Sequence, residues 1–148
     1  MKSALVNNAK RPVFSHVDGV TPTDALTRGG GRIDLAEAAN PEALFDPASV
    51  SFGLHTGNRR VTETRVISIC SAPGGSFSFT ATGTIPVDLE MSFSPDEATL
   101  GAGDCGEVEA TLSASRSSDL NGNHLGDIEV TGGGDTFLLP WLAGFENR

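Results

Sequence analysis

VDLEMSFSPDEATLGAGDCGEVEATLSAS, residues 87–115, carries the clearest structural signal in the chain. Apolar and polar residues alternate over residues 87–94 and again over residues 108–115. Such alternation places the apolar side chains on one face of a strand and the polar ones on the other. Between the two runs stand Ser94-Pro-Asp96 and Gly101-Ala-Gly103, which are typical of turns. The stretch therefore predicts two strands, each with one dry face and one wet face.

The same two-residue period continues over most of the chain after Pro47. Further strands are predicted at residues 50–52, 61–71, 76–80, 128–131 and 136–142. Residues 61–71 fit least well, because their polar side chains do not keep to one parity. About seven short strands separated by turns predict a mainly β chain with an antiparallel β-sandwich.

Two short helices are predicted before Pro47. Leu5 and Ala9 stand four residues apart, the spacing of one helix face. Asp34 and Glu37 form a capping-box pattern ahead of an alanine-rich run, with Asp34 as the N-cap. The predicted division is a helical segment, residues 1–46, followed by the β-sandwich, residues 47–148.

RGGGRIDLAEAANP, residues 28–41, raises the question of a phosphate-binding loop. A Walker-type loop needs a Lys and a Ser or Thr directly after its glycines, and the sequence continues with Arg32-Ile-Asp34. The dinucleotide pattern G-x-G-x-x-G fails as well, and an acidic N-cap repels phosphate. We therefore interpret the glycines as residues that allow a tight turn with positive φ.

The charge balance argues against nucleic acid as a partner. Lys and Arg number 10 against 19 Asp and Glu, which gives a net charge of −9. A phosphate polymer is repelled by such a surface. No run approaches the roughly 20 apolar residues of a membrane helix, so no membrane contact is expected. The first residues, MKSALVNNAKRP, contain no secretory signal core, so an export signal would lie upstream.

No sequence motif predicts a catalytic residue, a cofactor site or a zinc site. One segment has oxygen-bearing side chains at alternating positions, as calcium loops do. These candidate ligands are Asp119, Asn121, Asn123 and Asp127. The segment has His124 where such loops have glycine, and Val130 where they have glutamate. A plain Asn/Gly turn between two strands is the alternative interpretation.

Cys70 and Cys105 are the two cysteines of the chain. An even number permits one disulfide, which the chain-entropy model values at roughly 3–4 kcal/mol for a loop of this length. Two buried free thiols that pack as small apolar groups are the alternative. Neither cysteine lies in a C-x-x-C pattern, so a metal knuckle is not expected.

Four segments, taken in order, resemble the C-terminal part of subtilisin-like serine proteases. Residues 1–9, MKSALVNNA, resemble the IKSALMNTA helix of that family. Residues 28–39, RGGGRIDLAEAA, are similar to the D-x-G-x-G-x-v-d-x-x-x-A stretch that follows it. Residues 40–53 resemble the junction between the protease domain and its fibronectin-III-like domain. Residues 126–141 are similar to the last two strands of that domain.

This resemblance implies a helical remnant of an α/β protease domain followed by an Ig/fibronectin-III-like β-sandwich. In the family the catalytic Asp, His and Ser and the oxyanion Asn lie upstream of the helix matched by residues 1–9. No catalytic residue is therefore carried over to this chain, and we expect it to be inactive alone, because the triad acts as a unit. The implied parent is a secreted serine endopeptidase that needs no cofactor.

The implied partner is the upstream catalytic domain, and the sandwich would stabilise that domain or contact a protein substrate. A free-standing extracellular β-sandwich for adhesion or carbohydrate binding is the alternative function. Sugar faces stack on exposed aromatic rings, and the chain has one Trp, Trp141, and no Tyr. A calcium-stabilised module built on Asp119 to Asp127 is a further alternative.

Overall fold

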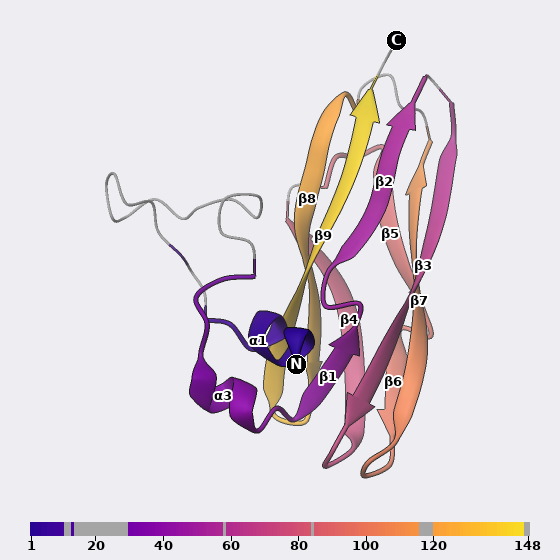
Figure 1. The fold of residues 1–148 in the computed structure, drawn as a ribbon. Coiled ribbons are helices and arrows are strands. Elements are labelled where there is room, and N and C mark those ends of the chain that lie inside the picture. Colours follow the sequence, from indigo (N-terminus) through magenta and orange to yellow (C-terminus); the bar gives the residue numbers. More distant parts are fainter. Residues whose placement is uncertain (11–12, 14–29, 58, 84, 116–119, 147–148) are drawn as a thin grey trace.

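The computed structural model describes residues 1–10, 13, 30–57, 59–83, 85–115 and 120–146, and it is a two-sheet β-sandwich with two short helices at one side (Figure 1). The helices are α1 (Lys2–Asn7) and α3 (Leu35–Ala39). The strands are β1 (Ala43–Asp46), β2 (Val50–Thr56), β3 (Val61–Ser71), β4 (Gly75–Gly83), β5 (Leu89–Ser94), β6 (Glu97–Leu100), β7 (Cys105–Ala114), β8 (Gly122–Gly132) and β9 (Asp135–Glu146). The mainly β sandwich predicted from the sequence is thus confirmed.

The strands form a four-stranded sheet, in the order β1-β3-β7-β5, and a five-stranded sheet, in the order β2-β9-β8-β4-β6. All pairs of neighbouring strands are antiparallel except β2 with β9, which are parallel. Strands β1 and β6 were not among those predicted. Each has four residues, which is too short for a two-residue period to stand out from chance.

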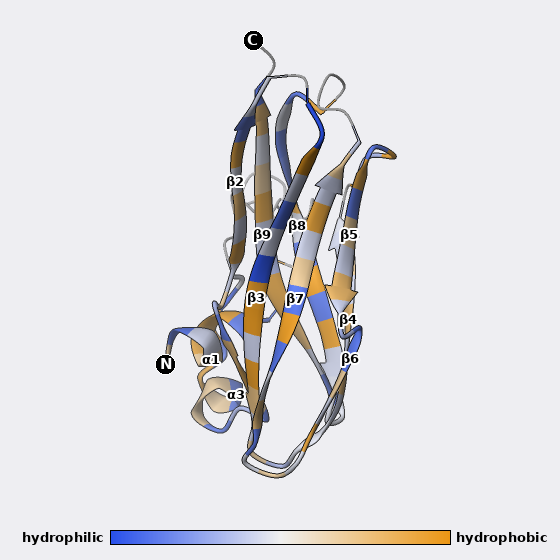
Figure 2. Ribbon diagram, turned by 90° about the vertical axis from the view of Figure 1, so that its right-hand side faces the viewer, coloured by the Kyte–Doolittle hydropathy of each residue, from blue (hydrophilic) through white to orange (hydrophobic). Residues whose placement is uncertain are grey.

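The core lies between the sheets and is rich in aromatic rings. Its largest fully buried side chains include Phe52, Phe77, Phe137, Trp141 and Phe145. Along β7 the residues Ala110, Leu112 and Ala114 are at most 1 % exposed, while the intervening residues face outward. Figure 2 shows this alternation of hydrophobic and hydrophilic residues along β3 and β7. The two-residue alternation in the sequence of β7 therefore corresponds to alternating buried and exposed side chains in the structure.

Gly126 lets three chain segments come close together in the five-stranded sheet. A Cβ at this position would collide with the carbonyl oxygen of Thr82 and would lie 2.8 Å from Nε1 of Trp141. The Trp141 Nε1 donates a hydrogen bond to that same Thr82 oxygen at 3.3 Å. The indole is only 2 % exposed, and its one polar atom still has a partner.

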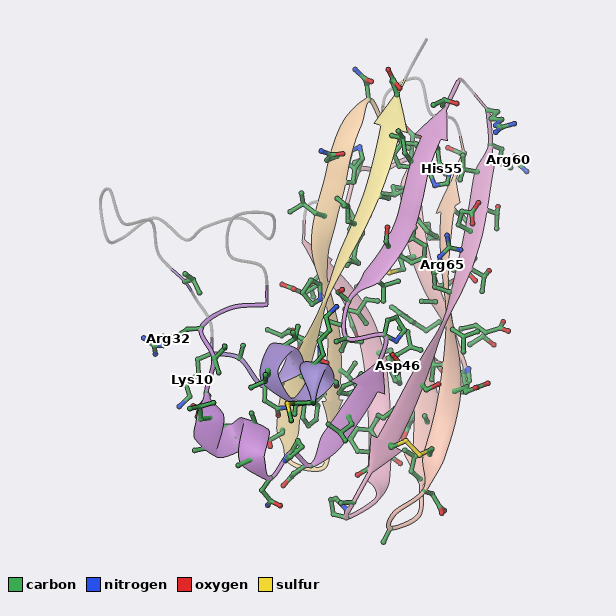
Figure 3. The ribbon with its side chains drawn as sticks, in the orientation of Figure 1. Lys10, Arg32, Asp46, His55, Arg60 and Arg65 are labelled. Atoms are coloured by element: carbon green, nitrogen blue, oxygen red, sulfur yellow. A yellow bond between two sulfur atoms is a disulfide. The ribbon has the colours of Figure 1, made fainter. Side chains whose placement is uncertain are left out.

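The irregular parity of residues 61–71 has a structural cause. Strand β1 pairs only with Ser68–Ser71 of β3, so the first half of β3 is a sheet edge. Glu63 and Arg65 have the inward parity there, but both are only half-buried, and they form an ion pair with each other at 3.1 Å. Arg65, labelled in Figure 3, donates from its Nε to the Ser51 carbonyl oxygen of β2 at 2.9 Å. Inward charges at an edge also hinder pairing with another chain.

Candidate functional site

The most elaborate polar arrangement described is the contact between α1 and the sandwich. Asn7 is 2 % exposed, and its Nδ2 donates to the carbonyl oxygens of Ala48 at 2.9 Å and Leu138 at 3.0 Å. Ser3 Oγ donates to Asn7 Oδ1 at 2.8 Å and accepts from the backbone N–H of Phe45 at 2.6 Å. One serine and one asparagine thus hold the helix to β1, to the β1–β2 crossover and to β9.

This docking face differs from the one expected from the apolar spacing. Leu5 and Ala9 have the spacing of one helix face, but α1 ends at Asn7 and both residues are only half-buried. The face turned to the sandwich carries Ser3, Ala4 and Asn7, with Ala4 7 % exposed. Backbone groups at a sheet crossover need hydrogen-bond partners, and polar side chains supply them where apolar ones cannot. We call this group of residues the α1 clamp.

A second set of contacts ties the end of α1 to the segment that enters α3. Lys10 and Arg32 form an antiparallel bridge, with N–H to oxygen distances of 2.8 and 3.1 Å. Lys10 Nζ lies 2.6 Å from Asp34 Oδ2, and Figure 3 shows Lys10 and Arg32 at the same side of the molecule. The Asp34 carboxylate also accepts from the N–H groups of Ala36 and Glu37, as the predicted N-cap. The Lys10 side chain is 59 % exposed, whereas that of Asp34 is only 15 % exposed.

The contacts of this ion pair shift both pKa values. The hydrogen bond that the Lys10 ammonium donates to the Asp34 carboxylate, together with the charge of that carboxylate, raises the pKa of Lys10 above its ordinary value. The hydrogen bond from Lys10, followed by that from the Glu37 N–H, lowers the pKa of Asp34 below 3.8. Both groups are therefore charged over a wide range of pH.

Gly30 and Gly31 are needed for the conformation and close packing of the backbone. Gly31 has a φ of 110°, which side chains rarely allow, and a Cβ at Gly30 would lie 2.9 Å from Val6 Cγ1. Gly29 lies outside the described residues. Helix α3 has five residues, and the Asp34 carboxylate accepts from the N–H groups of its first turn, which leaves these donors already bonded to an anionic group.

The candidate calcium ligands are not brought together in the part of the chain that the structure describes. Asn121 and Asn123 are exposed where β8 begins, whereas Asp127 lies inside β8 opposite Pro140. A strand rises about 3.3 Å per residue, so the backbones of Asn123 and Asp127 stand about 13 Å apart. Asp119 lies outside the described residues. Among the described residues, no group of three or more His, Cys, Asp or Glu is placed to hold a metal ion.

Two of the three histidines have packing roles. The rings of His55 and His124 lie 5.2 and 5.7 Å from the ring of Phe145. His124 Nε2 also lies 2.8 Å from the Leu120 oxygen. His16 falls outside the described residues. These contacts are those of structural histidines at the end of the sandwich.

Cys70 and Cys105 are joined by a disulfide. They stand directly opposite each other on β3 and β7, and the sulfur–sulfur bond is drawn in yellow in Figure 3. The sequence left open a disulfide or two buried free thiols, and the structure contains the disulfide. Disulfides persist in oxidising compartments, so this one is consistent with an extracellular location. Within the described residues, no helix has the length and apolar character needed to cross a membrane.

Comparison with known proteins yields similarity of fold only. No protein-family model matches the chain, and no curated protein matches it either. Among solved structures it is similar to the Vibrio cholerae VesB protease, with a TM-score of 0.45 and 15 % identity over 76 % of this chain. The chain spans 34 % of the length of that protease.

This chain matches a larger share of two further solved structures. The PapD-like domain 7 of human CEP192 has a TM-score of 0.47 and 11 % identity, covering 72 % of this chain and 87 % of that one. The periplasmic chaperone SfaE has a TM-score of 0.44 and 6 % identity, with shares of 70 % and 58 %. None of these matches carries an argument about function. The described residues form a two-sheet β-sandwich domain, and the comparisons assign it to no family.

Proposed function

We propose that this chain is the C-terminal part of a secreted subtilisin-like serine endopeptidase, whose catalytic domain lies upstream. The sandwich is non-catalytic and stabilises that domain. The observation that carries this proposal is the α1 clamp: Ser3, Ala4 and Asn7 are all residues shared with the IKSALMNTA helix of that family. The three residues that hold the helix to the sandwich are thus all shared with that family's helix, as are Lys2, Leu5 and Ala9.

The clamp suggests how stabilisation would work. In the parent protein α1 belongs to the catalytic domain, so one of its faces packs on that domain while Ser3 and Asn7 pack on the sandwich. Loosening the helix then costs the contacts of both faces. A domain that contacts the helix only in its folded state stabilises that folded state, so the sandwich and the catalytic domain stabilise each other through α1. The disulfide supports the further proposal that the parent is exported.

Activity assays test the non-catalytic role. We expect the 148-residue chain to hydrolyse neither casein nor a chromogenic peptide, because nucleophile, base and orienting carboxylate must act together. Turnover that is abolished by a serine-directed inhibitor would contradict the proposal.

The reading frame upstream tests the assignment itself. We expect it to continue into G-T-S-[MA]-A-x-P and to encode an active protease. Deleting residues 47–148 from that longer protein is then expected to shorten its half-life at elevated temperature. An upstream frame without a serine protease domain would refute the assignment. A carbohydrate-binding role gains no support, because the ring of Trp141 is buried and offers no platform for a sugar.

A further inference from the structure

Strand β5 forms one edge of the four-stranded sheet, on the side of the sandwich away from the two helices (Figure 2). The Ser115 N–H donates to the Asp88 oxygen at 3.2 Å, directly before the first residue pair of the β5–β7 ladder. Hydrogen-bonded and non-hydrogen-bonded pairs alternate along an antiparallel ladder. The even-numbered residues of β5 therefore direct their backbone groups to β7, whereas Met91 and Phe93 direct theirs to the open side of the strand.

The backbone groups on this open side have no partner strand. Strand β5 pairs with β7 alone. Within the described residues, no hydrogen bond joins the N–H or the carbonyl oxygen of Met91 or Phe93 to another residue. The N–H of Leu89, at the start of the strand, donates to the Pro86 oxygen at 3.0 Å. A row of unpaired backbone donors and acceptors is a template onto which an extended chain can add as a further strand.

Other sheet edges carry features that hinder such an addition. On β1 the N–H of Phe45 is capped by Ser3 Oγ of α1. The first half of β3 has Arg65, which is bonded across to Ser51. Strand β2 has a register shift next to Gly53, whose φ is 88°. Cover, inward charge and irregularity protect an edge, whereas β5 has a regular register, apolar inward residues and no glycine or proline.

The inward side chains of β5 are apolar and incompletely covered. Leu89 is 3 % exposed, whereas Met91 and Phe93 are half-buried and pack against the core from its margin. The ring of Phe93 lies 5.9 Å from that of Phe79 in the other sheet. Apolar side chains of an added strand that face inward would cover Met91 and Phe93 and remove their exposed area from water. The edge therefore favours a segment whose inward residues are apolar.

The outward side of this edge is acidic. Glu90 on β5 and Glu107 and Glu109 on β7 are exposed, and neither strand contains a lysine or an arginine. Arg60 lies at one end of this surface, where it lines a hollow with Asp88 and Glu90. Opposite charges on neighbouring strands stabilise a sheet and like charges destabilise it. A second copy of this chain, with its net charge of −9, would bring the same carboxylates together, so the charges favour a basic partner.

We infer that the open edge of β5 binds an extended segment of a partner protein as an additional antiparallel strand. Its apolar side chains cover Met91 and Phe93, and its basic side chains lie beside Glu90 and Glu109. The antiparallel direction matches every other pair in this sheet. Residues directly opposite each other share a face, so the backbone groups that face β5 belong to the apolar residues of the segment. The inference does not depend on the assignment to a protease.

A labelled octapeptide of alternating valine and lysine, capped at both ends, is the probe. We expect saturable binding to the 148-residue chain in fluorescence polarisation. Methylation of the valine nitrogens removes the donors that face β5 and is expected to weaken binding at least tenfold. Methylation of the lysine nitrogens, which face solvent in the added strand, is expected to weaken it less than threefold. Equal losses with the two patterns, or no saturable binding at millimolar peptide, would overturn the inference.

A matched pair of charge variants provides the second readout. Glu90→Lys is expected to weaken binding of the peptide at least fivefold. Asp135→Lys makes the same change of charge at an exposed carboxylate beside α1 and α3, and it is expected to weaken binding less than twofold. Equal effects of the two variants would overturn the inference.

Sedimentation analysis decides between the peptide and a second copy as the occupant of the edge. The chain is expected to remain monomeric at the concentrations of the binding assay. Met91→Pro removes the N–H on the open side but no hydrogen bond to β7. A dimer that this variant dissociates would overturn the inference, because a second copy of the chain would then occupy the edge.

Discussion

Replacing Asn7 with alanine is the sharpest test of how α1 is held. The amide group is 2 % exposed and makes two hydrogen bonds to carbonyl oxygens on different parts of the sandwich, at Ala48 and Leu138. The alanine variant leaves both oxygens without their donor. It also removes the acceptor of the Ser3 hydroxyl, which is only 2.8 Å away.

The expected cost follows from the burial of these groups. A buried group that loses its partner costs about 1–3 kcal/mol. The bond to Ala48 is buried and the bond to Leu138 is partly buried, so water can replace the second more easily. We therefore expect a total loss of about 2–3 kcal/mol. Since every 1.4 kcal/mol is a factor of ten, the docked state of α1 becomes about 30- to 150-fold less favoured.

Hydrogen exchange followed by mass spectrometry measures this loss locally. The amides of α1 and the N–H of Phe45, which donates to Ser3 Oγ, are expected to exchange about 30- to 150-fold faster in Asn7→Ala. Asn8→Ala is the matched control, because the Asn8 side chain at the C-cap of α1 donates back to the Ala4 oxygen of the helix. If the two variants exchange at the same rate, the clamp does not hold the helix and our reasoning is refuted.

Three other changes have expected outcomes. Breaking the Cys70 disulfide, which spans 35 residues, is expected to lower the unfolding free energy by about 3–4 kcal/mol and Tm by about 10 °C in calorimetry. Asp34→Asn is expected to speed amide exchange in α3 by the same factor at pH 5 and at pH 9. The ion pair in the parent chain is lost only when pH falls through the lowered pKa of Asp34 or rises through the raised pKa of Lys10, and both pH values lie between these limits. Different factors at the two pH values would contradict this prediction. Arg65→Ala removes the hydrogen bond to Ser51 and uncovers the edges formed by β2 and the first half of β3. We expect the unfolding free energy in denaturant to fall by about 1 kcal/mol and self-association in light scattering to rise. A strictly monomeric variant would contradict this prediction.

The two-residue period made the sandwich predictable, because burial in a two-sheet fold depends on that period alone. It predicted the strands at residues 87–94 and 108–115 as amphipathic, and both strands have buried and exposed faces in the structure. The prediction was wrong for Val87, which lies before β5 and is fully exposed. The same logic missed β1 and β6, which are too short for a period. It also failed for Glu63 and Arg65, because parity shows which side of the sheet a residue occupies but not where the neighbouring strand ends.

The α1 clamp could not be predicted from apolar spacing. Its docking face consists of Ser3, Ala4 and Asn7, and polar residues at i and i+4 ordinarily indicate the solvated side of a helix. The signal that could have found it is the resemblance, since these three residues match the family's helix. The cysteine pairing and the spacing of the calcium candidates likewise depended on tertiary structure. Only the register of β3 with β7 shows that Cys70 faces Cys105.

The packing of the molecule crosses the predicted division at residues 46 and 47. Strand β1 belongs to the predicted helical segment, yet it pairs with β3, and the ring of Phe45 lies 5.3 Å from that of Phe137 in the core. The Phe45 N–H in turn donates to Ser3 Oγ. This hydrogen bond links α1 to an edge strand whose Phe45 ring lies in the core. The division remains a prediction about how the chain relates to a protease, but a sandwich cut at residue 47 would lack both a strand of its own sheet and an aromatic ring of its core. If α1 is part of a catalytic domain, that domain and the sandwich cannot separate without disturbing β1, which makes the sandwich a structural support and not a tethered module.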